Sequence, residues 1–129
     1  MAAREGRGVI CHSSELLNSG RGVRFKVRRH GEIAPAFAIR FDDKVHAYLN
    51  RCAHRALELD WEEGEFFDAF GEHLICASHG ARFEPASGAC VGGPCHGAGL
   101  VKLMVTEEDG QLCLEPEDDI HLVPSDEVA

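Results

Sequence analysis

Two pairs of cysteine and histidine constrain the fold of this chain more than any other feature. Cys52 and His54 are separated by one residue, and Cys76 and His79 by two. Cysteine thiolates are soft ligands, and neutral imidazole also binds iron and zinc. One metal centre can use all four side chains only if the fold brings two loops, distant in the sequence, face to face. We therefore expect the rest of the chain to be a scaffold for these two loops.

The scaffold reads as β structure. Apolar and basic residues alternate from Val23 to Arg28, and Phe37, Ile39 and Phe41 share one side of a second alternating stretch. A period of two is typical of half-buried strands. Asp42-Asp43 predicts a hairpin turn into a strand that ends before Cys52. Other strands are expected near residues 9–11, 73–76, 82–84, 100–105 and 112–114, with one helical turn after an N-cap at 13–17 and a last hairpin around 108–110.

This arrangement resembles the Rieske [2Fe–2S] family over roughly residues 20 to 115. Besides the two Cys–His pairs, Gly80 follows the last histidine, and Gly92-Gly93-Pro94 is similar to the family's proline loop, which lies over the cluster. The resemblance implies an all-β, antiparallel β-sheet sandwich with a small cluster-binding subdomain at about 51–96. It implies one [2Fe–2S] cluster per chain. Cys52 and Cys76 would bind the inner iron through sulfur, and His54 and His79 the outer iron through nitrogen.

The length of 129 residues suits one domain, 1–129, with a loose N-terminus at 1–8 and a lightly packed acidic tail at about 116–129. The formal net charge is −9, which argues against nucleic-acid binding. No apolar run is long enough for a membrane span, and the N-terminus lacks the apolar core of a signal peptide. We expect a soluble, cytoplasmic protein.

The stretch between the two ligand pairs departs from the family. It is several residues longer than usual, carries acidic residues throughout 58–72, and has no basic residue from Ala56 to Ala81 apart from histidine. We expect a longer hairpin or loop here, with Trp61, Phe66, Phe67 and Phe70 packed beneath it. Its acidic residues form either a solvated face or the rim of a docking surface for a basic partner.

The remaining cysteines leave two questions open. Cys11 and Cys113 read as small apolar residues. Cys90 and Cys95 flank the glycine-rich turn and could form a disulfide, which a reducing compartment disfavours. The four ligands would also suit zinc, although their order differs from the common zinc-finger order. The other histidines read as surface or structural residues, and His96 is the one nearest the cluster loops.

High-potential members of the family have a disulfide between the two cluster loops, a Ser after the second loop and a Tyr two residues later. The corresponding residues here are Leu57 and Ser78 for the disulfide, Ala81 for the Ser and Phe83 for the Tyr. Hydrogen bonds to cluster or ligand sulfur raise the potential. Their absence predicts a potential near the lower end of the class, on the order of −150 mV.

The resemblance implies an electron carrier with no substrate site of its own. It would pass one electron from an NAD(P)H-dependent, flavin-containing ferredoxin reductase to a terminal oxygenase of aromatic compounds. Two rivals stay open: an accessory subunit of a larger enzyme, as in the small subunit of nitrite reductase, and a redox-sensing or iron-sensing interaction module. The sequence names neither the partners nor the final substrate, and it does not give the oligomeric state.

Overall fold

The computed structural model describes residues 8–51, 59–60, 64–76, 80–92, 99–115 and 120–123. Within these ranges the fold is almost entirely antiparallel β structure, and the only helical element is the 3-10 turn η2 (Ser13–Glu15). This confirms the predicted all-β class. The described residues include no helix with the length and apolarity that are needed to cross a membrane.

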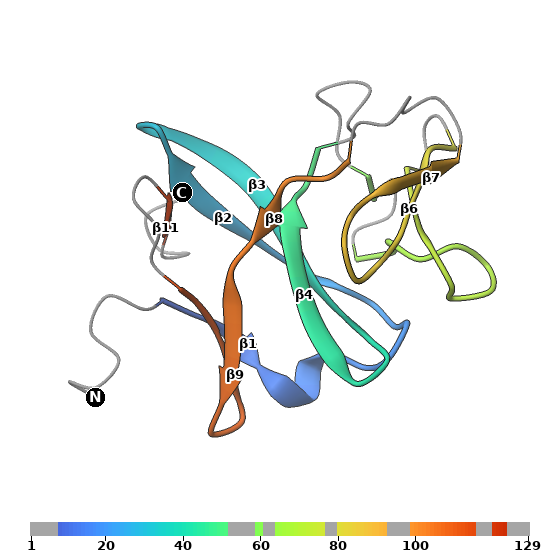
Figure 1. Ribbon diagram of the computed structural model, residues 1–129. Coiled ribbons are helices and arrows are strands. Elements are labelled where there is room, and N and C mark those ends of the chain that lie inside the picture. Colours follow the sequence, from blue (N-terminus) through green and yellow to red (C-terminus); the bar gives the residue numbers. More distant parts are fainter. Residues whose placement is uncertain are drawn as a thin grey trace.

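A five-stranded sheet forms the middle layer of the molecule (Figure 1). Its strands, in spatial order, are β11 (Ile120–Leu122), β2 (Val23–Arg29), β3 (Glu32–Phe41), β4 (Lys44–Leu49) and β8 (Lys102–Leu103). The turn between β3 and β4 is the predicted Asp42-Asp43 pair, and both residues have positive φ, which Asp tolerates better than most residues. The hairpin that leads toward Cys52 is therefore confirmed.

Two smaller sheets cover the two faces of this middle layer. One contains β1 (Gly8–His12), β10 (Gln111–Leu114) and β9 (Val105–Glu108), and the other contains β5 (Leu74–Ile75), β6 (Arg82–Phe83) and β7 (Cys90–Gly92). In Figure 1, β6 and β7 lie on one side of β4, and β1 and β9 lie on the other.

Strand β3 explains how one sheet supports two cores. Successive side chains of a strand point to opposite faces. Ala36 and Ala38 pack in the core shared with β1 and β10, whereas Phe37 and Ile39 pack in the core shared with β5 and β6. The core that contains Phe37 and Ile39 is called the upper core. Its buried members are Phe37, Ile39, Tyr48, Leu59, Phe66, Leu74, Cys76, Ala81, Phe83 and Leu100. Its members come from the middle sheet and from the segments around the predicted ligand loops.

Three expectations need correction. Residues 100–105 do not form one strand of the last hairpin, because β8 joins the middle sheet and β9 joins the sheet of β1 and β10. The acidic tail is not lightly packed at residues 120–123, the part of it that is described, since β11 pairs with β2 and Val123 is buried. The helical turn is 3-10 and begins after His12, whose backbone N–H donates to the Glu15 carboxylate at 3.0 Å.

Arg40 joins the middle sheet to the sheet of β1, β10 and β9. Its guanidinium contacts both carboxylate oxygens of Glu107, at 3.3 and 2.6 Å, and donates to the carbonyls of Leu16 and Ser13. The hydrogen bond from Arg40 holds the pKa of Glu107 below its ordinary value of 4.5. A carboxylate with a depressed folded pKa stabilises the fold above its unfolded pKa, and this stabilisation is lost as the pH falls through the folded pKa.

We expect Glu107→Gln to lower the melting temperature near pH 7, because the charged partner of Arg40 is removed. The difference from the wild type should shrink as the pH falls from about 4.5 through the lower folded pKa of Glu107, since the wild-type carboxyl is then protonated in the folded protein as well. Thermal unfolding followed by circular dichroism at several pH values measures this. A difference that stays constant from about pH 7 to about pH 3 would contradict the proposed origin of the stabilisation.

Candidate metal centre

Cys76 is the one predicted ligand that lies within the described residues. It follows β5 directly, its side chain is fully buried, and its sulfur takes no part in a disulfide. Its backbone N–H donates to the carbonyl of Ala81 at 2.9 Å, and the N–H of Gly80 donates to the carbonyl of Cys76 at 2.7 Å. These two hydrogen bonds pin both ends of the segment 77–79, which contains His79 and lies outside the described residues.

The first ligand loop is also closed at its base. Cys52 and His54 belong to the segment 52–58, outside the described residues. On either side of that segment, Asn50 and Leu59 are fully buried, and the backbone N–H of Leu59 donates to Oδ1 of Asn50 at 2.9 Å. The residues on the two sides of this segment are therefore both in the protein interior, and a side-chain hydrogen bond holds them together.

The third segment is the one that contains Gly93 and Pro94. It runs from β7 to Gly99, and residues 93–98 lie outside the described residues. The N–H of Leu100 donates to the carbonyl of Gly88 at 2.8 Å, so the return of the chain is fixed beside the turn that precedes β7. Cys90 is disulfide-bonded, whereas Cys11, Cys76 and Cys113 are not.

Each of the three segments has a described residue next to it, or close to it, that packs in the upper core. Leu59, Cys76, Ala81 and Leu100 are members of the upper core, and Cys90 packs against it. The predicted face-to-face meeting of two ligand loops is therefore compatible with the described anchors, and the proline loop emerges from the same region. A water-excluded cysteine outside any disulfide fits an iron–sulfur cluster at this meeting point, because thiolate is the ligand type that such clusters use.

Tyr48 attaches the turn before β7 to the middle sheet. Its hydroxyl donates to the carbonyl of Pro85 at 2.7 Å, and its ring fills the space beside Gly88. Burial raises the pKa of Tyr48, so the hydroxyl stays protonated and can donate. Lys102 adds a second link from β8 through the carbonyl of Ala86 at 2.9 Å.

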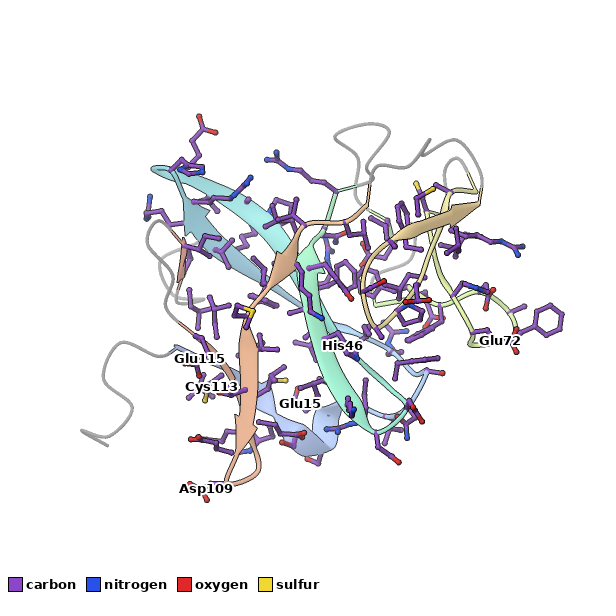
Figure 2. The ribbon with its side chains drawn as sticks, viewed as in Figure 1. Glu15, His46, Glu72, Asp109, Cys113 and Glu115 are labelled. Atoms are coloured by element: carbon purple, nitrogen blue, oxygen red, sulfur yellow. The ribbon has the colours of Figure 1, made fainter. Side chains whose placement is uncertain are left out.

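The acidic stretch forms a hairpin, as predicted, between Phe66 and Ile75. The N–H of Asp68 donates to the carbonyl of His73, and the N–H of Ile75 donates to the carbonyl of Phe66, each at 2.9 Å. Phe66 is fully buried, and Phe67 packs against the upper core. Phe70 is 84% exposed, so the expectation that it packs under the loop is wrong, and Trp61 lies outside the described residues. Glu72 marks this hairpin at one end of the molecule (Figure 2).

The described cysteines and histidines away from this place do not form a second metal site. In the described ranges, no three or more His, Cys, Asp or Glu side chains are grouped so that they could hold a metal ion. Burial raises the pKa of the Cys11 thiol to about 11, which agrees with its predicted role as a small apolar residue. His46 is largely buried, and burial lowers its pKa, with a further contribution from Lys102. His96 lies outside the described residues.

Sequence reasoning missed two buried polar residues beside the first loop, Asn50 and Asp60. Their only signal in the sequence was position. Asn50 directly follows β4, at the start of the first ligand loop, and Asp60 reads as one member of an acidic run. Periodicity does not distinguish a buried, hydrogen-bonded carboxylate from a solvated one.

Comparison with known structures identifies the same architecture. The ferredoxin of carbazole 1,9a-dioxygenase from Nocardioides aromaticivorans IC177 superposes with a TM-score of 0.68 at 23% identity, over 86% of this chain and 98% of that chain. The Sphingomonas yanoikuyae B1 ferredoxin gives 0.65 at 24% identity, over 84% and 97%. The terminal oxygenase of the Nocardioides system gives 0.67 at 19% identity, over 88% of this chain but 30% of the oxygenase chain.

At these identities the structural matches establish the fold alone. A sequence comparison with curated proteins finds no match. The family comparison is decisive, since the Rieske [2Fe-2S] domain matches residues 6–112, which is most of the chain and includes both Cys–His pairs and the Gly-Gly-Pro segment. This chain belongs to the Rieske [2Fe-2S] domain family, whose members bind one [2Fe–2S] cluster.

Proposed function

We propose that Cys52, His54, Cys76 and His79 hold the [2Fe–2S] cluster, and that the protein is a one-electron carrier. The observation that carries this proposal is the meeting of the three loop bases at the upper core, next to the buried sulfur of Cys76. With Cys52 in this ligand set, we propose Cys95 as the disulfide partner of Cys90, since Cys11, Cys76 and Cys113 are not disulfide-bonded.

The chain's own residues would control charge and water around the cofactor. When bound, a [2Fe–2S] cluster supplies reversible one-electron chemistry. The imidazoles of His54 and His79 add no negative charge, whereas two further thiolates would make electron uptake less favourable. Because Cys76 is fully buried, water is kept from its sulfur. The residues at 54 and 79 would form the outer side, through which a partner exchanges the electron.

The proposed donor is an NAD(P)H-dependent, flavin-containing reductase, and the proposed acceptor is a terminal oxygenase. Two observations support the carrier role and the oxygenase acceptor. The chain covers 98% and 97% of two ferredoxins but only 30% of a terminal oxygenase chain, so the match to the carriers is the more complete one. One of those carriers is the ferredoxin of a dioxygenase. We propose the same role here, without a substrate site on this chain.

Electron paramagnetic resonance tests the ligand set and the carrier role together. The protein is purified without air, and spectra are recorded before and after dithionite, with iron and sulfide assays on the same sample. We expect two irons and two sulfides per chain and a rhombic signal of the His-ligated type that appears only on reduction. A colourless protein with one zinc per chain and no signal would refute the proposal.

Ala81 and Phe83 predict a low reduction potential. Both side chains are fully buried in the upper core with Cys76, and neither has a hydroxyl that can donate to sulfur. We expect a wild-type potential on the order of −150 mV by protein-film voltammetry. Ala81→Ser and Phe83→Tyr should each raise it, because a new donor stabilises the more negative, reduced state.

The matched control for Ala81→Ser is Ala36→Ser, which adds the same hydroxyl at a fully buried site in the other core. It should leave the potential unchanged. A wild-type potential well above zero, or equal shifts in both serine variants, would show that hydrogen bonding at position 81 does not set the potential.

A further inference from the structure

Asn50 and Asp60 form a buried polar contact at the base of the first ligand loop, which we call the Asn50–Asp60 clasp. The side-chain N–H of Asn50 donates from Nδ2 to Oδ1 of Asp60 at 3.0 Å. The other end of the Asn50 amide, Oδ1, accepts from the backbone N–H of Leu59. Asn50 is itself held to the middle sheet, because its backbone N–H donates to the carbonyl of Pro35 at 2.8 Å.

Asp60 extends the clasp to two further segments. Its Oδ2 accepts from the backbone N–H of Gly64 at 2.9 Å and lies 3.5 Å from Nε of Arg24 on β2. The Asp60 side chain has no exposed surface, whereas Arg24 is one-third exposed. A carboxylate buried in this way is costly unless its oxygens are paired, and here each of its two oxygens has a partner.

The hydrogen bonds of the clasp connect the two ends of the first ligand loop. Asn50 precedes the segment 51–58, and both hydrogen bonds of its side-chain amide reach residues that follow this segment, Leu59 and Asp60. The loop that contains Cys52 and His54 is thus closed by two side chains that are fixed from the middle sheet and from the beginning of the acidic stretch. Neither residue belongs to the ligand set.

We propose that Asn50 and Asp60 are positioning residues for the first Cys–His pair, because the clasp holds both ends of the loop that carries it. This inference rests on the proposed ligand set. Residues behind the direct ligands fix ligand orientation, and their loss typically weakens metal binding about 10- to 100-fold. A rigid base for this loop would keep Cys52 and His54 facing the second pair and limit their separation from it.

The test is a pair of single variants and their combination. Asn50→Asp places two carboxylates in contact and should be the more severe change. Asp60→Asn replaces the charged acceptor for the Asn50 amide with a neutral amide. The double variant Asn50→Asp/Asp60→Asn restores the hydrogen bonds of the clasp in reverse: a carboxylate at position 50 accepts from Leu59 and from the amide at position 60, whose oxygen accepts from Gly64.

The main readout is the rate of cluster loss, followed by bleaching of the visible absorbance in the presence of a chelator. We expect each single variant to lose its cluster about 10- to 100-fold faster than the wild type, and the double variant to recover most of this loss. The EPR g values should change in the single variants and return in the double variant. Hydrogen exchange around Leu59 in the cluster-loaded protein, followed by mass spectrometry, should accelerate only in the single variants.

Arg40→Gln is the matched control for stability. Arg40 is also a polar link with several partners, but it lies on the face of the middle sheet away from the upper core. It should lower the melting temperature and leave the g values and the rate of cluster loss unchanged. Faster cluster loss in the control, or no rescue in the double variant, would reduce the clasp to a general stabilising contact and overturn the inference.

The two proposals fail in different ways. A wild-type protein without the His-ligated signal would overturn the ligand set and, with it, the role of the clasp. A wild type with that signal, whose single variants lose the cluster at the wild-type rate, would overturn the clasp alone. If Asn50→Asp does not fold, Asp60→Asn and the double variant still decide the outcome.

Discussion

Phe66→Ala is expected to lower the free energy of unfolding by about 3–5 kcal/mol, the usual range for a fully buried phenylalanine. The Phe66 ring is stacked on Phe37 of β3, with ring centroids 3.9 Å apart and an interplanar angle of 12°. This contact attaches the acidic hairpin to the middle sheet. Truncation removes the stack and leaves a cavity in the upper core, beneath the bases of the three loops.

Thermal unfolding of the cluster-loaded protein measures the effect, and we expect a fall in Tm on the order of 10 °C. Phe70→Ala is the matched control, because it makes the same change in the same hairpin at a residue that is 84% exposed. The control should change the free energy of unfolding by less than about 0.5 kcal/mol. Similar losses in both variants would mean that Phe66 does not anchor the hairpin.

Gly88→Ala is expected to destabilise the protein by about 2–5 kcal/mol, from backbone strain and overpacking together. Gly88 has a φ of +78°, which costs energy for any residue with a Cβ. A Cβ at this position would also lie 2.7 Å from Cε1 of Tyr48. Tyr48 cannot move away freely, because its hydroxyl is bound to the Pro85 carbonyl in a buried site.

Gly110→Ala separates these two contributions. Gly110 has a similar φ of +76°, and a methyl group at its Cβ position would have no neighbour within 4 Å. It should therefore show the backbone strain alone, and the larger fall in Tm for Gly88→Ala should report the clash with Tyr48. Equal falls in both variants would show that the turn before β7 adjusts without cost and that Tyr48 does not fix its position.

The predictions that succeeded came from local patterns with one physical reading. The alternation of Val23, Phe25 and Val27 identified the inward face of β2, and the Asp42-Asp43 pair identified the turn between β3 and β4. The Cys–His spacing identified the family. The ligand roles of Cys52, His54 and His79 stay predictions, because these residues lie outside the described part of the chain.

The predictions that failed concerned what covers a given residue. Phe66 and Phe70 are the same residue type four positions apart, yet one is in the core and the other is in solvent. Leu103 and Val105 both looked like members of one strand, but they belong to different sheets. Local periodicity records which residues share a face, whereas the covering element comes from a distant part of the chain.

The sequence by itself determined the family, the β scaffold and the lack of hydroxyl donors at positions 81 and 83, because each depends on residue identity and short spacing. Only the tertiary structure decided that the bases of three loops meet at the upper core. It also decided that Asn50 and Asp60 close the base of the first ligand loop. Asp60 is one acidic residue among many in the sequence. It is distinguished only by its partners on β2, at the end of β4 and beyond the loop, which folding brings to it.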